Sequence, residues 1–132
     1  MLDDKSYLEL FAARALGPEH FDHRGHLYIA WLHLVHFDED EARQRVCSGI
    51  RELAARFGAQ EKYNHTLTEA LVRIMARRLS GVSRQSFDTF LETNPDLLCD
   101  AHTVLARHYS DACLNSVRAK VSWVEPDRDA IE

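Results

Sequence analysis

The sequence predicts an all-α protein, a single-domain bundle of five or six helices around a buried central helix. Apolar residues recur at helical spacing in several stretches, whereas no stretch shows the sustained alternation typical of a strand. A chain of 132 residues is also long enough to bury one hydrophobic core. We therefore expect one domain over residues 1–132, with the last six residues frayed.

The first predicted helix spans residues 4–15 and ends before Gly17-Pro18. The central helix follows, with Asp22 as its N-cap and His23 as its first residue. The stretch from Phe21 to Phe37 is apolar on nearly every face, yet it carries histidines at positions 23, 26, 33 and 36. A helix that is apolar all round is typically buried, and polar groups there need hydrogen-bond partners, protons or a metal.

The third and fourth helices are predicted from capping signals and apolar stripes. The acidic run from Asp38 to Glu41 suits a helix start, because the helix dipole favours negative charge there, and Gly58 suits the end of that helix. In the fourth helix Thr66 is predicted as the N-cap and Glu69 as its capping-box partner. Its core face is the apolar series Leu67, Ala70, Leu71, Ile74, Met75 and Leu79.

The remaining elements are shorter or less regular. Ser83 or Ser86 is predicted to cap a short helix through Leu91. Asn94-Pro95 predicts the start of another helix that continues to Tyr109. The segment after it is irregular, and we expect Trp123 to pack it back onto the helices.

Composition excludes several classes of function. The formal net charge of −5 argues against nonspecific nucleic-acid binding, which needs a basic face. Three widely spaced cysteines without a CxxC motif favour a reducing, cytoplasmic setting over a disulfide framework or a thiolate zinc site. The first residues lack the basic and apolar regions of a signal peptide, so we expect no export signal. The longest apolar run is far short of the roughly 20 residues that span a bilayer.

The metal candidates are His23, His26 and His65. The first two lie three residues apart at the start of the central helix, so they share a face and can converge on one ion. The positive end of the helix dipole disfavours imidazolium there and keeps a ring nitrogen available. His65 and Glu69 are four residues apart and would complete a set of three histidines and one carboxylate. The alternative is that His26 is a core histidine bonded to backbone and Glu69 is a capping residue.

The other candidates surround this predicted site. Glu69, as a fourth ligand or a general base, and Tyr63 are the catalytic candidates. Thr66 and Thr68 are predicted to bind substrate. Alternatively, they act as helix caps. Trp31 is counted with the substrate-binding residues, although its position in an apolar stretch is also typical of a core anchor.

Three motifs resemble an uncharacterised family of small bacterial helical proteins. They are Phe21-x-His23-x-x-His26-Leu27 followed by Ala30-Trp31, then Lys62-Tyr63 with His65-Thr66-Leu67-Thr68, and finally Trp123-Val124-Glu125-Pro126-Asp127. In that family a histidine often follows the lysine-tyrosine pair directly, where this chain has Asn64 and then His65. The resemblance implies that the two histidine motifs belong to one site. It implies no reaction, cofactor or substrate.

These observations favour a metal-dependent helical enzyme that acts on a small molecule, with one transition-metal ion as cofactor. A redox metal would indicate an oxygenase or oxidase, and zinc a hydrolase. Two alternatives stay open. One is a metal-free protein that binds a small molecule or anion near the helix N-termini. The other is an interaction module in which the apolar helix completes the core of a homodimer.

Overall fold

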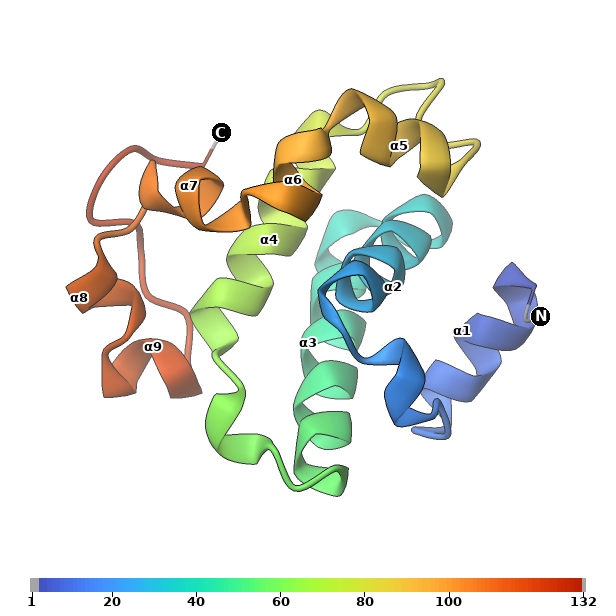
Figure 1. Ribbon diagram of the computed structural model, residues 1–132, viewed down its shortest axis with the longest axis horizontal. Coiled ribbons are helices and arrows are strands. Elements are labelled where there is room, and N and C mark those ends of the chain that lie inside the picture. The colour runs from blue at the N-terminus through green and yellow to red at the C-terminus, as the bar shows by residue number, and fades with distance from the viewer. Residues whose placement is uncertain (1–2, 132) are drawn as a thin grey trace. The chain divides into compact units, whose positions relative to one another are not determined.

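A computed structural model describes residues 3–131 and confirms the all-α class, since these residues form helices, turns and loops without a strand (Figure 1). The helices are more numerous and shorter than predicted. In chain order they are α1 (Asp4–Ala12), η1 (Pro18–His20), α2 (His23–His36), α3 (Glu39–Arg56), η2 (Gln60–Lys62), α4 (His65–Arg78), α5 (Phe87–Thr93), α6 (Pro95–Cys99), α7 (Ala101–Ala106), α8 (Asp111–Leu114) and α9 (Val117–Val121), where η denotes a 3₁₀ helix. Contacts group the chain into two compact units, residues 1–63 and 64–132.

In the first unit α2 packs along α3, and α1 packs against both helices. Seven of the fourteen residues of α2 are buried, as expected of a helix that is apolar on most faces. The ring of Phe11 lies directly on Gly49 of α3, where a Cβ atom would come within 2.0 Å of the ring. The core comprises Tyr7, Phe11, Leu16, Leu27, Ile29, Ala30, Trp31, Leu32, Leu34, Ala42, Val46, Cys47, Ile50, Leu53 and Ala54.

In the second unit α4 is contacted by α7 and α9, while α6 contacts both α5 and α7 (Figure 1). Arg78 in the last turn of α4 donates to Asp96 at 2.6 Å, which ties the end of α4 to the start of α6. The pKa of Asp96 is lowered from its ordinary value, mainly by this hydrogen bond. The core comprises Ala70, Leu71, Val72, Ile74, Met75, Phe87, Phe90, Leu97, Val104, Leu105, Tyr109 and Ala119.

Two helices end earlier than predicted. The first ends at Ala12 because Arg14 turns into the left-handed region, with φ of 58°, and its guanidinium then binds Glu52 at 2.9 Å. The helix predicted from Asn94-Pro95 to Tyr109 is interrupted at Asp100, whose φ of −149° and ψ of 42° are not helical. It therefore forms α6 and α7 as separate short helices.

The fraying predicted for residues 127–132 does not begin at Asp127. Its carboxylate accepts two hydrogen bonds from Ser110, one from the backbone N–H at 2.8 Å and one from the hydroxyl at 2.6 Å. The backbone N–H groups of Arg128 and Asp129 donate to the carbonyls of His108 and Arg107, which follow α7. Glu132 lies outside the described residues.

Few large apolar side chains are exposed within residues 3–131. They are Val82, Val117 and Val121, and none of these lies on α4 or α5. Exposed apolar residues on those two helices would have favoured the homodimer alternative. The homodimer stays a prediction.

Candidate functional site

The start of α2 holds His23 and His26 through a tightly built turn. The carboxylate of Asp22 accepts from the backbone N–H of Gly25 at 2.7 Å, which confirms Asp22 as the N-cap and His23 as the first helical residue. The carbonyl of His20 lies so close to Gly25 that a Cβ atom would come within 1.9 Å of it. Glycine is therefore required at this position, because it alone lets the preceding turn rest on the helix.

The imidazole of His26 is held among apolar groups. Its ring meets the Phe21 ring edge to face, with centroids 4.4 Å apart. The pKa of His26 is lowered to about 4, mainly by burial and less by the nearby His23, while Asp22 opposes the shift. The ring is therefore neutral at physiological pH, with one N–H and one lone pair.

The Nε2 atom of His26 is buried and has no hydrogen-bond partner within the described part of the chain. No other side-chain nitrogen or oxygen in that part of the chain is buried without a partner. Leaving a buried donor or acceptor unpaired costs about 1–3 kcal/mol. Such an atom calls for a partner from outside the described residues, such as a water molecule, an ion or a bound small molecule.

The two later histidines of α2 differ from His26. His33 is buried, but its Nδ1 lies 2.7 Å from the carbonyl of Ile29, so this ring nitrogen has a hydrogen-bond partner inside the helix. Burial again lowers its pKa. His36 is exposed at the end of the helix. His33 is thus a core histidine bonded to a backbone carbonyl, the alternative role considered for His26, whereas His26 shows no such bond.

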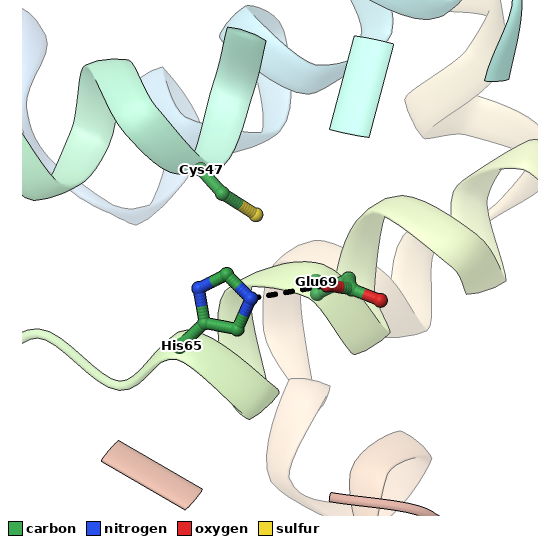
Figure 2. Close-up of side chains that lie close together, drawn as sticks. All are labelled: Cys47, His65 and Glu69. Carbon is green, nitrogen blue, oxygen red and sulfur yellow. Dashed lines mark hydrogen bonds and ion pairs between the residues drawn. The ribbon is translucent and has the colours of Figure 1, made fainter. Parts of the chain in front are cut away.

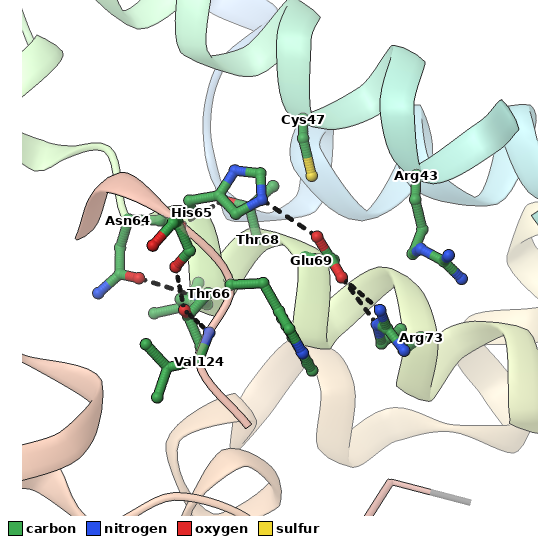
Figure 3. Close-up of polar contacts among 12 residues, drawn as sticks. Arg43, Cys47, Asn64, His65, Thr66, Thr68, Glu69, Arg73 and Val124 are labelled. Atoms are coloured by element: carbon green, nitrogen blue, oxygen red, sulfur yellow. Dashed lines mark hydrogen bonds and ion pairs between the residues drawn. The ribbon is translucent and has the colours of Figure 1, made fainter. Parts of the chain in front are cut away.

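The start of α4 corrects one prediction. Asn64, and not Thr66, is the N-cap, because its carboxamide oxygen accepts from the backbone N–H of Leu67 at 3.0 Å (Figure 3). Its amide nitrogen donates to the carbonyl of Leu114 at 2.7 Å. The helix thus begins two residues earlier than predicted, and His65 is its first residue.

Glu69 is not the capping-box partner either. Its Oε1 lies 3.1 Å from Nε2 of His65, one turn earlier on the same helix (Figure 2). Its Oε2 accepts from Nε and Nη2 of Arg73 at 2.9 and 2.6 Å (Figure 3). The guanidinium of Arg73 in turn lies over the Trp123 ring, 4.2 Å from its centroid.

The hydroxyl groups of Thr66 and Thr68 are both used within the second unit. Thr66 is fully buried, donates to the carbonyl of Ser122 at 2.7 Å and accepts from the backbone N–H of Val124 at 3.0 Å (Figure 3). Thr68 donates to the carbonyl of Asn64 at 2.9 Å. These contacts favour a structural task for both residues, so their assignment to substrate binding stays a prediction without structural support.

The two predicted aromatic site residues belong to the first unit. Trp31 is buried and its ring stacks with Tyr28, with centroids 6.1 Å apart, as expected of a core anchor. Tyr63 is partly exposed, and its hydroxyl donates to the carbonyl of Cys47 at 3.3 Å. Neither contact tests a role with substrate.

The predicted site residues thus form two groups. His23 and His26 share the first turns of α2 in the first unit, while His65 and Glu69 share those of α4 in the second. One ion bound by both pairs stays a prediction. The residue that sequence reasoning missed is Arg73, although it follows Glu69 by four residues, the spacing at which an acidic and a basic residue pair on a helix.

Comparisons with protein-family models, with curated proteins and with solved structures give no match. Within residues 3–131, every helix is too short or too polar to cross a membrane.

Proposed function

We propose that this protein is a metal-dependent enzyme whose transition-metal ion is bound at the start of α2 by His26 and His23. The observation that carries the proposal is the buried Nε2 atom of His26, which has no partner in the described residues. Neutral imidazole is a common metal ligand, and the low pKa of His26 keeps it neutral even in mild acid.

His23 fits the role of a second ligand. It precedes His26 by three residues on one helix, so the two side chains lie on successive turns of the same face. The charge of His23 also contributes to the lowered pKa of His26, which supports the view that the two rings lie near one another. Because His23 is exposed, the pair lies between the buried core and solvent, where a small molecule can approach.

The donor set restricts the metal and the reaction. Two imidazoles without a thiolate suit iron, copper, nickel, manganese or zinc. Two protein ligands leave coordination positions for water and a small-molecule substrate, as catalytic sites require. A redox-active metal would support oxygen chemistry, and zinc would support hydrolysis by lowering the pKa of bound water.

The test is elemental analysis of the untagged protein by plasma mass spectrometry, next to a His23→Ala/His26→Ala double variant. We expect about one equivalent of a transition metal in the native chain and loss of most of that metal in the double variant, which lacks both proposed ligands. His36→Ala is the matched control, since it removes an exposed histidine from the other end of the same helix. Circular dichroism checks that all three proteins are folded.

The proposal fails if the native protein binds no metal after anaerobic reconstitution with iron, copper, manganese, nickel and zinc salts. It also fails if the double variant, still folded, keeps the metal. Stabilisation of the metal-free protein by inorganic phosphate would then favour the anion-binding alternative.

A further inference from the structure

A row of contacting side chains joins α1, α2 and α3 in the first unit. Its members, in order, are Arg14, Phe11, His33, Phe37 and Arg45. The guanidinium of Arg14 lies 5.6 Å from the centroid of the Phe11 ring, and that of Arg45 lies 4.4 Å from the centroid of the Phe37 ring. The ring of His33 meets Phe11 edge to face at 5.0 Å and stacks with Phe37 at 5.7 Å. The imidazole is thus the central member of the row.

One hydrogen bond fixes the proton of the neutral His33 ring. Its Nδ1 lies 2.7 Å from the carbonyl oxygen of Ile29. Because a carbonyl oxygen only accepts, Nδ1 is the nitrogen that carries the proton, and a second proton has to bind Nε2. His33 is 4% exposed, so the charge of the protonated ring would lie almost entirely away from water, which is costly.

The groups around His33 also disfavour a charged ring. The pKa of His33 is lowered, mainly by burial, and the charges of Arg45, His36 and Arg14 act in the same direction, whereas the bond to Ile29 opposes the shift. Each of the three helices thus contributes, because Arg14 follows α1, His36 ends α2 and Arg45 lies on α3.

No carboxylate offsets these positive charges at the ring. Within residues 3–131, the acidic partners in this region bind the arginines, Glu41 at 2.7 Å from Arg45 and Glu52 at 2.9 Å from Arg14. Both phenyl rings of the row already contact a guanidinium, so a charged His33 would share each ring with a second cation. The row is therefore suited to a neutral His33.

The helix that can separate most easily from this row is α1. Its buried residues are Tyr7 and Phe11, whereas α2 and α3 each bury seven residues. Segments with few buried apolar contacts open locally at a lower cost than the rest of a domain. Opening of α1 removes Phe11 from the His33 ring and exposes that ring to water, where the protonated form is stable.

We propose that His33 is a pH-dependent switch that keeps α1 packed on α2 and α3 while its ring is neutral and releases α1 when its ring is protonated. The sign follows from the surroundings of the ring. The packed state favours the neutral form, so the open state binds the additional proton and gains population as the pH falls. The switch does not depend on the proposed metal site.

The experiment is hydrogen–deuterium exchange of the full chain between about pH 7 and about pH 5, with a chelator present and mass spectrometry as the readout. Protection factors correct for the pH dependence of the chemical exchange rate. We expect protection in α1 to fall below about pH 6.5, by up to about tenfold per pH unit, the largest change that one proton can produce. Protection in α3 should fall less.

Two variants remove the titrating ring in different ways. The amide of His33→Gln can still donate to the carbonyl of Ile29, and His33→Phe keeps an aromatic ring in the row. We expect α1 protection in either folded variant to be nearly constant over this pH range. The matched control is His36→Gln, which removes an exposed imidazole from the end of the same helix and should follow the wild type. Circular dichroism checks that each variant is folded.

Three results would overturn the proposal. Constant α1 protection in the wild type does so without any variant. An equal fall in the wild type and in a folded His33 variant also does so, because another group would then be responsible. An equal loss of protection in α1, α2 and α3 would show unfolding of the whole first unit and not release of α1.

Discussion

Within residues 3–131, the buried polar atoms of side chains have hydrogen-bond partners, with the exception of Nε2 of His26. Thr66 and His33 are both buried, and each finds its partner among backbone groups. His26 has a buried ring nitrogen that finds none within the described residues. Because an unpaired buried group lowers stability, His26 does not contribute to stability through this nitrogen as His33 and Thr66 do through theirs. This is why the functional proposal is placed at His26.

Thr66→Val tests whether the Thr66 hydroxyl is structural. Valine has nearly the same shape but removes one donor and one acceptor, which leaves the carbonyl of Ser122 and the N–H of Val124 without this partner. We expect the free energy of unfolding to fall by about 1–3 kcal/mol, measured by urea denaturation. Thr68→Val is the control, because it removes only one bond to a carbonyl within the same turn and should cost less. An equal effect of the two changes would contradict the anchoring role of Thr66.

At the scale of the element, sequence predicted helix starts well where the cap acts locally. Asp22, Asp38 and Ser86 each cap the helix that follows them, through a backbone N–H three residues later. Asn64 was missed because Thr66 and Glu69 matched a capping box equally well. The choice depends on a partner fifty residues away, since the Asn64 amide also binds the carbonyl of Leu114.

Sequence could not show where a helical pattern breaks. The apolar spacing continues from Leu97 through Leu105 without a glycine or proline, yet Asp100 leaves the helical conformation. The Asp100 carboxylate accepts from the Thr103 hydroxyl at 2.8 Å and so supports the new helix start. A local hydrogen bond of this kind between two side chains is not visible in the apolar pattern.

Gly49→Ala tests the close contact between Phe11 of α1 and Gly49 of α3. Within a helix this change normally stabilises by about 1 kcal/mol through propensity alone. Here the new methyl group would overlap the Phe11 ring, at 2.0 Å, and overpacking typically costs 1–3 kcal/mol or more. We therefore expect a net loss of about 1–2 kcal/mol in thermal or urea unfolding.

The matched control for this change is Gly81→Ala. A Cβ atom at Gly81 would meet nothing within 4 Å, so the same substitution should be neutral or slightly stabilising there. A stable Gly49→Ala variant with unchanged unfolding would mean that Phe11 can leave α3 without cost.

At the scale of the whole molecule, sequence predicted the all-α class and picked out the histidines of α2, because both depend on periodicity and residue type. It could not separate His26 from His33, which occupy similar positions on the apolar helix. The difference lies in one hydrogen bond from the ring of His33 to the carbonyl of Ile29. That bond depends on side-chain rotamers, which a sequence pattern does not encode.

The stability of the molecule should depend on pH through His26. Its pKa of about 4 in the folded protein lies below the ordinary value near 6.5, so between these pH values the unfolded chain binds a proton that the folded chain does not. The free energy of unfolding is therefore highest above pH 6.5 and falls as the pH drops towards 4, by on the order of 3 kcal/mol from this residue. His33, whose pKa is also lowered by burial, acts in the same direction, so the wild type must be compared with His26→Gln. Urea denaturation with a chelator present should show a weaker loss in acid for His26→Gln, whereas His36→Gln should follow the wild type. Parallel curves for the wild type and His26→Gln would show that the His26 ring is not held neutral in the folded protein.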